Sequence, residues 1–134
     1  MSISVRRVEY FYTTVGEGAY RLLGDLAGLG VNLLALHTVP LGPDSTQLTL
    51  FPEDARHFVS AAERARLKLD GPHHALLVQG DDQMGALAGV HAKLRAADVS
   101  VFASMCVTDG HGYYGYVIYL RPEDADKAAK ALEI

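Results

Sequence analysis

The chain has 134 residues, of which 49% are hydrophobic and 21% are charged, and its formal net charge is -4. This composition is typical of a globular protein, and the negative charge argues against a nucleic-acid groove, which requires clustered Lys and Arg. The N-terminal residues lack the apolar core of a signal peptide, and no stretch approaches the roughly 20 apolar residues of a membrane span, so we expect a cytoplasmic protein that binds neither nucleic acid nor membrane. Cys106 is the only cysteine, so the chain offers no disulfide and no Cys-based metal motif.

Alternation of apolar and polar residues, helical spacing and turn residues predict the elements of the first half. In chain order they are a strand at 5–12, a loop at 13–18, a helix from Ala19 to a cap at Gly30, a strand at 31–39, a turn at 41–44, a strand at 46–51 and a helix that begins at Pro52. A fourth strand could follow at 66–69.

The same signals predict a linker at Asp70-Gly71-Pro72 and a second set of elements after it. They are a strand at 75–79, a loop at 80–84, a helix that ends near Ala97, a strand at 99–108, a turn at 109–112, a strand at 116–120 and a helix at 122–132. The chain stops at Ile134, too early for a closing strand of normal length, so the source of that strand is left open.

The two halves repeat one pattern. At an offset of 68, LLGDLAGLGVNL at 22–33 matches VHAKLRAADVSV at 90–101, and at an offset of 70, FPEDA at 51–55 matches RPEDA at 121–125. Such a fixed period indicates a duplication, here of residues 1–70 and 71–134. Each half has roughly 65 residues and would bury only about 60% of its unfolded surface, so we expect the halves to share a sheet or a core.

The order strand, glycine-bearing loop, helix, Gly30-Val31-Asn32-Leu33, hairpin and Pro-Glu-Asp-Ala helix resembles the ACT domain, a ferredoxin-like module that binds amino acids and regulates enzymes of amino-acid metabolism. The loop Asp81-Asp82-Gln83-Met84-Gly85 lies where that family has an acidic or Asn residue before Pro-Gly. The resemblance covers almost the whole chain. It implies an α+β fold of two tandem ferredoxin-like βαββαβ (ACT-type) repeats, side by side in a shared antiparallel sheet with helices on one face.

A small-molecule ligand can be placed in such a pair of repeats by simple chemistry. The N-terminus of a helix offers unpaired amides that suit a carboxylate, and a glycine there lets the backbone come close. If the repeats join about a two-fold axis, Asn32 faces the loop that holds Asp82, and Ser100 faces the loop 14–18. The predicted ligand-binding residues are therefore Asn32, Asp82, Gln83, Met84, Gly85, Ser100, Thr14, Gly16 and Gly18.

Several of these features also have a purely structural interpretation. Asp82 could cap a helix or be a solvated loop carboxylate, and Asn32 could bond only to local backbone groups. Cys106 is expected to be a small buried filler on an apolar strand, and the loop 109–114 a tight connection. The tyrosines of the strands either line a pocket or are ordinary strand residues: Tyr10, Tyr12, Tyr113, Tyr114, Tyr116 and Tyr119.

The sequence shows no catalytic motif, phosphate loop or metal-ligand spacing, so we expect no catalysis and no cofactor. The interpretation that the resemblance favours is a stand-alone sensor that binds an amino acid or related metabolite between its repeats, acts on a regulated enzyme or transcriptional partner, and forms a homodimer. The alternative is a metal-dependent enzyme of the glyoxalase and dioxygenase superfamily, built from paired βαβββ units with Glu9, His37 and His74 as ligands. A third option is a structural dimerisation module with an empty interface.

Overall fold

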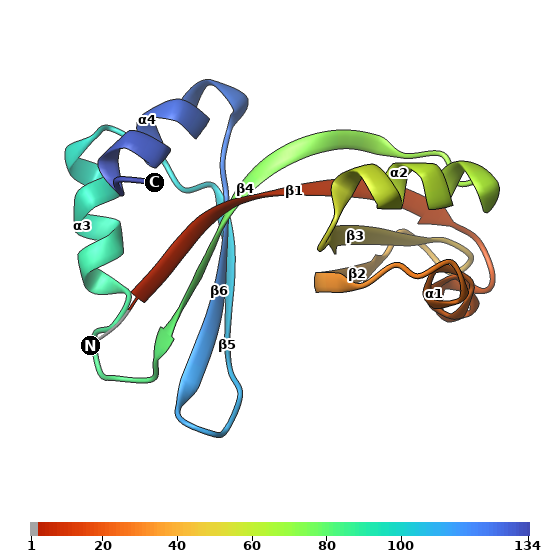
Figure 1. Cartoon of the computed structure of the whole chain (residues 1–134), viewed down its shortest axis with the longest axis horizontal. Coiled ribbons are helices and arrows are strands. Elements are labelled where there is room, and N and C mark those ends of the chain that lie inside the picture. The colour runs from red at the N-terminus through yellow and green to blue at the C-terminus, as the bar shows by residue number, and fades with distance from the viewer. Residues whose placement is uncertain (1–2) are drawn as a thin grey trace. The chain divides into compact units, whose positions relative to one another are not determined.

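The structure is a computed structural model that describes residues 3–134 (Figure 1). The elements are, in chain order, β1 (Ile3–Val15), α1 (Ala19–Gly28), β2 (Leu33–Pro40), β3 (Thr46–Pro52), α2 (Ala55–Arg64), β4 (Asp70–Asp81), α3 (Ala88–Ala96), β5 (Ala103–Thr108), β6 (Tyr113–Tyr119), the short 3-10 helix η1 (Pro122–Asp124) and α4 (Ala125–Ala131). The strands are hydrogen-bonded in the order β2-β3-β1-β4-β6-β5. The predicted α+β architecture with an antiparallel sheet is confirmed.

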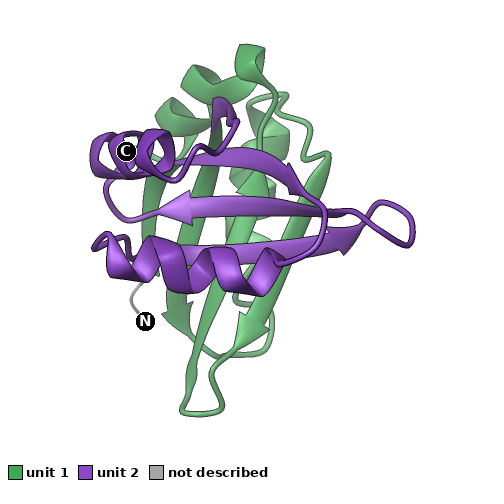
Figure 2. Cartoon of the chain, turned by 90° about the vertical axis from the view of Figure 1, so that its right-hand side faces the viewer, with its two compact units in different colours: residues 1–8, 74–134 green, residues 9–73 purple. Residues whose placement is uncertain are grey.

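The chain divides into two compact units, coloured separately in Figure 2. Unit 1 contains residues 1–8 and 74–134, and unit 2 contains residues 9–73. The predicted repeats, 1–70 and 71–134, place residues 1–8 in the other half. The side-by-side arrangement of the repeats, with all helices on one face, stays a prediction.

Unit 2 is a complete βαββαβ unit. Its strands follow the order β2-β3-β1-β4, with the hairpin β2–β3 and the pair β1–β3 both antiparallel. Alternate strand residues point to one face of the sheet, and there Phe11, Leu48 and Leu50 pack with Leu26 of α1 and Phe58 of α2. Both helices therefore cover the same face of this sheet, as the ferredoxin-like prediction requires.

Unit 1 repeats this architecture and takes its closing strand from the beginning of the chain. Its strands follow the order β1-β4-β6-β5, and β1 contributes residues 3–8. Val5 packs against the unit's core, and the Arg7 Nη1 atom lies 3.3 Å from the Asp126 Oδ1 atom of α4. The strand that the sequence could not place after α4 thus comes from the N-terminal segment.

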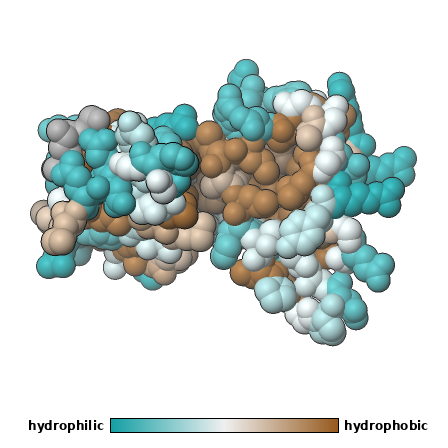
Figure 3. Space-filling model, turned by 90° about the horizontal axis from the view of Figure 1, so that it is seen from below, coloured by the Kyte–Doolittle hydropathy of each residue, from teal (hydrophilic) through white to brown (hydrophobic). Residues whose placement is uncertain are grey.

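The core of unit 1 lies between its sheet and its helices. Leu76 and Ile118 of the strands are fully buried against Leu94 of α3 and Ala128 of α4. Large hydrophobic side chains are also exposed, among them Met105, and Figure 3 shows hydrophobic surface interrupted by polar side chains on one face. In residues 3–134, every helix is too short or too polar to cross a bilayer.

Two predicted element boundaries are wrong. The predicted linker at Asp70–Pro72 is the beginning of β4, so the strand of residues 66–69 that was expected to close unit 2 lies a few residues too early. Pro52 ends β3 and does not begin a helix. The helix α2 begins at Ala55, because the Asp54 carboxylate accepts a hydrogen bond of 3.1 Å from the His57 N–H and caps the first turn.

Candidate functional site

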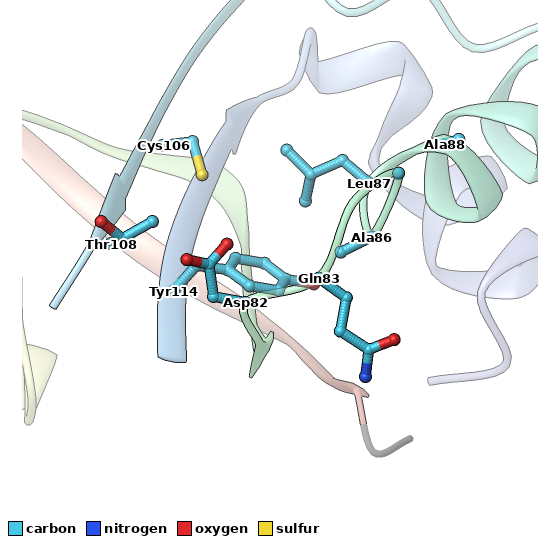
Figure 4. A pocket seen from close by; sticks show the side chains of 9 residues that line it. Asp82, Gln83, Ala86, Leu87, Ala88, Cys106, Thr108 and Tyr114 are labelled. Carbon is cyan, nitrogen blue, oxygen red and sulfur yellow. The ribbon is translucent and has the colours of Figure 1, made fainter. Parts of the chain in front are cut away.

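A hollow of about 320 Å³ lies in unit 1, in front of the first residues of α3 (Figure 4). We call it the α3 pocket. The connection from β4 to α3 forms one side, and β5 and β6 form the other. Its lining residues are Asp82, Gln83, Gly85, Ala86, Leu87, Ala88, Cys106, Thr108 and Tyr114.

The α3 end of the pocket has chemistry that suits an anion. Leu87 precedes the helix, and no side chain caps its first turn. The N-terminal end of a helix carries a partial positive charge that suits a carboxylate. In α3 the first amide is not free, because the Ala88 N–H donates to the Gly85 carbonyl at 3.0 Å. Asp82 does not cap this helix, and its own N–H donates to the Gly112 carbonyl at 2.8 Å. The residue is exposed, which agrees with the interpretation of Asp82 as a solvated loop carboxylate.

Two tyrosines of β6 differ in their hydrogen bonding. Tyr114 and Tyr116 are two residues apart, both are buried, and both belong to the core beneath α3. The Tyr116 hydroxyl shares a hydrogen bond of 2.7 Å with His91 of α3. Among the described residues, the Tyr114 hydroxyl is the buried side-chain group without a hydrogen-bond partner. Figure 4 shows the Tyr114 ring extending from β6 beside Asp82. Leu87, one helical turn before His91, lines the same pocket.

Cys106 was expected to be a buried filler, and that prediction is wrong. The residue is exposed, and it stands on the edge strand β5 with its sulfur turned toward the pocket (Figure 4). Desolvation at the pocket wall raises the pKa of the Cys106 thiol, and the negative charge of Asp82 adds to the rise. The thiol is therefore protonated near neutral pH and is a weak nucleophile.

The pocket is electronegative. Asp82 is the only charged residue in its lining, and neither Lys nor Arg lines it. Burial raises the pKa of the Tyr114 hydroxyl, with further contributions from Cys106 and Asp81. Both pKa directions thus arise first from desolvation, and the carboxylates of Asp82 and Asp81 add smaller contributions of the same sign.

The remaining predicted ligand residues of unit 1 lie outside this hollow. The Met84 side chain is fully exposed, and Ser100 is an exposed residue between α3 and β5. The structure therefore brings Asp82, Gln83 and Gly85 together at the pocket. Of the strand tyrosines, Tyr114 lines this pocket, and Tyr12 lines a separate hollow in unit 2.

Asn32 belongs to unit 2 and is engaged locally. Its side-chain amide donates to the Glu53 carboxylate, and its backbone carbonyl accepts a hydrogen bond of 2.9 Å from the Glu53 backbone N–H. With Asp54 and His57, these residues line a hollow of about 160 Å³. The Asn32 side chain is therefore engaged within unit 2, by the Glu53 carboxylate and not by the backbone groups that the local interpretation named. Its predicted role in ligand binding stays a prediction.

The loop that opens α1 in unit 2 has hollows of its own. Gly18 lines one of about 430 Å³ together with Arg21 and Asp25, and Thr14 lines one of about 260 Å³. Gly16 lines neither hollow. Unlike the α3 pocket, the hollow at Gly18 includes a cationic side chain.

Sequence reasoning did not assign Thr108, Leu87 or Cys106 to the site. The signal that could have found them is strand register: Thr108 pairs with Tyr114, and Cys106 pairs with Tyr116. Residues two apart on a strand share a face, so the helix-facing side of β5 is Cys106 and Thr108. That register follows from the hairpin, whose turn at 109–112 was predicted and lies between the observed ends of β5 and β6.

Comparisons with known proteins give matches in structure. No family model and no curated protein matches the chain. A protein of Bacteroides thetaiotaomicron matches with a TM-score of 0.77 and 19% identity, over 96% of this chain and 88% of that one. The ligand-free regulatory subunit of aspartate kinase from Thermus thermophilus matches with a TM-score of 0.62 and 15% identity, over 99% and 95%. The corresponding subunit from Thermus flavus matches with a TM-score of 0.53 and 14% identity, over 99% and 95%.

The chain has the fold of an aspartate kinase regulatory subunit. At these identities the likeness concerns the fold alone, and it agrees with the two ferredoxin-like units that the ACT resemblance implied. The alternative of paired βαβββ units is not favoured, because each unit has a second helix, α2 or α4, directly after its hairpin.

Proposed function

We propose that the chain is a regulatory module that binds an amino acid or a related metabolite in the α3 pocket. The observation that carries the proposal is the coincidence of the predicted Asp82–Gly85 loop with a hollow at an uncapped helix start. Small-molecule sites are hollows with a few convergent polar groups, and this one has them.

Each end of an amino acid has a partner in this pocket. Asp82 suits the ammonium group as a charge-assisted acceptor, while the N-terminal end of α3 suits the carboxylate. Thr108 and Gln83 supply groups that both donate and accept hydrogen bonds. The lining residues suggest no chemical transformation of the ligand, so the function that we propose is binding.

Regulation is supported by the fold and by the position of the pocket. The structural neighbours include regulatory subunits of aspartate kinase. In this chain the pocket is bounded by β5, which ends the strand order and whose six residues are all exposed. Because β5 carries no charge and no proline, it is an unprotected edge that can pair with a second copy. A ligand beside this edge regulates by favouring one assembly state.

The other predicted features stay predictions. They are the pairing of Asn32 with the Asp82 loop across the repeats, with Ser100, Thr14, Gly16 and Gly18 at the second site, together with the regulated enzyme or transcriptional partner and the cytoplasmic location.

The proposal is tested by thermal shift of the intact chain against the standard amino acids. We expect at least one to raise the melting temperature, because a ligand that binds only the folded state stabilises it. The shift should be lost in Asp82→Asn and kept in Glu123→Gln, which removes an equal charge from an exposed position on η1. A shift that is equal in both variants contradicts the assignment of the site.

The homodimer is tested by sedimentation of Val107→Lys. Val107 is exposed on β5, and a charge on that edge should prevent pairing and leave a monomer. Lys at Val59, which is exposed on α2, is the matched control and should leave the assembly unchanged. A wild-type chain that is monomeric at all concentrations refutes the pairing.

A further inference from the structure

The orphaned Tyr114 hydroxyl indicates what the α3 pocket lacks. A buried hydroxyl without a partner is unfavourable, so native proteins rarely keep one. Here the neighbouring Tyr116 is satisfied by His91, while the hydroxyl of Tyr114, which also lines the pocket, has no partner. A tyrosine hydroxyl both donates and accepts, so an acceptor on a bound molecule can take its hydrogen once the flanking loop adjusts.

The charges around the pocket restrict what that acceptor can be. Asp82 lines the pocket, and Asp81 acts on Tyr114. The basic residues of α3, Lys93 and Arg95, lie in its last turn, at the opposite end of the helix. The helix start offers only about half a positive charge, which is matched by one carboxylate. A second carboxylate on the ligand would meet Asp82 or Asp81 without a cation nearby.

We propose that the α3 pocket selects amino acids by charge, and takes those that carry one ammonium group, one carboxylate and a neutral acceptor on the side chain. The acceptor receives the Tyr114 hydroxyl, and Asp82 pairs with the ammonium group. Acidic amino acids of the same size are excluded by the carboxylates. This selectivity rests on the proposed function.

The experiment uses the only thiol of the chain as the reporter. Cys106 lines the pocket, so a bound ligand shields it from alkylation. The rate of maleimide addition to the intact protein is measured against concentration of L-glutamine and of L-glutamate, which are nearly isosteric and differ in charge. We expect glutamine to protect at concentrations at least about tenfold lower than glutamate, because the Asp82 and Asp81 carboxylates repel the second carboxylate of glutamate.

Two variants separate the parts of the proposal. Asp82→Asn should weaken protection by glutamine and reduce the difference between the two ligands, since it removes the charge that repels glutamate. Tyr114→Phe should weaken protection by glutamine while leaving that by glutamate unchanged. A control thiol, Leu36→Cys in a Cys106→Ala chain, occupies the register position of Cys106 in unit 2 and should be indifferent to either ligand.

The outcomes distinguish the two levels of inference. Equal protection by glutamine and glutamate, or protection that Tyr114→Phe leaves intact, overturns the charge selection and keeps the pocket as a ligand site. If neither these two nor any other standard amino acid slows alkylation or shifts the melting temperature, the proposed function fails.

Discussion

The two units share one architecture but differ in the side chains at matching strand positions. In unit 2, Leu48 pairs with Thr13 of β1 and Thr38 of β2, and in unit 1 the corresponding Tyr114 pairs with Gly80 of β4 and Thr108 of β5. One step along the strands, Leu50 and Leu36 of unit 2 correspond to Tyr116 and Cys106 of unit 1. At Leu36, Leu48 and Leu50, unit 2 therefore has aliphatic side chains where unit 1 has a thiol and two phenolic hydroxyls, whereas Thr38 and Thr108 are the same residue type.

This difference teaches how a duplicated fold separates stability from binding. In unit 2 the buried Thr13 hydroxyl donates to the Lys68 carbonyl at 3.0 Å, so the polar group of that region is satisfied within the unit. In unit 1 the Tyr114 hydroxyl has no such partner. Buried polar groups are stabilising when they are satisfied and unfavourable when they are not. Unit 2 thus satisfies its buried hydroxyl internally, whereas unit 1 holds the unsatisfied hydroxyl on which the proposed binding site depends.

The largest expected effect is in the aliphatic core of unit 2. Leu48 is 0% exposed, so Leu48→Ala should lower the free energy of unfolding by about 3 kcal/mol, through lost burial and the cavity that remains. Urea unfolding followed by circular dichroism measures the loss. A loss below about 1 kcal/mol would show that this side of unit 2 is loosely packed and would break the comparison.

Tyr116→Phe should have an intermediate effect in the opposite unit. It removes the hydroxyl that is bonded to His91 and leaves that imidazole without its partner. We expect a loss of about 1 kcal/mol in the free energy of unfolding. An unchanged stability would mean that the 2.7 Å contact contributes nothing, and that the two tyrosines do not differ energetically.

Tyr114→Phe should shift stability in the other direction. Removing a buried hydroxyl that has no partner removes its desolvation penalty, so the ligand-free protein should become more stable by up to about 1 kcal/mol. The same urea titration measures the gain. If the variant is instead destabilised by as much as Tyr116→Phe, the hydroxyl has an acceptor in solution and the inference about the ligand loses its basis.

The smallest expected effect is the pH dependence that Cys106 adds. Its pKa is raised by desolvation and by Asp82, so the folded protein favours the protonated thiol. This contribution is complete below the pKa of an unfolded thiol, about 8.5, and is lost as the pH rises through the higher pKa of the folded state. The unfolding free energy of the wild type should therefore fall more steeply above this pH than that of Cys106→Ala. Parallel curves for the two proteins would contradict the desolvated thiol.

Sequence patterns alone determined most of the fold. The offsets of 68 and 70 residues revealed the duplication, and apolar periodicity predicted the helices and hairpins, because amphipathic spacing reports directly which face an element buries. The loop that contains Asp82 was selected by its resemblance to the ACT-domain loop that precedes a helix, and this resemblance is also read from neighbouring residues. These features depend on neighbouring residues, so they can be predicted from the sequence.

Only the tertiary structure decided what depends on pairing between distant segments. It assigned residues 3–8 as the closing strand of unit 1, since strand pairing joins residues that are far apart in the chain and leaves no local pattern. Register likewise placed Cys106 and Thr108 at the pocket with Tyr114. The tertiary structure also pairs the Asn32 side chain with the Glu53 carboxylate. It places His91 of α3 against the Tyr116 hydroxyl and leaves the Tyr114 hydroxyl unsatisfied.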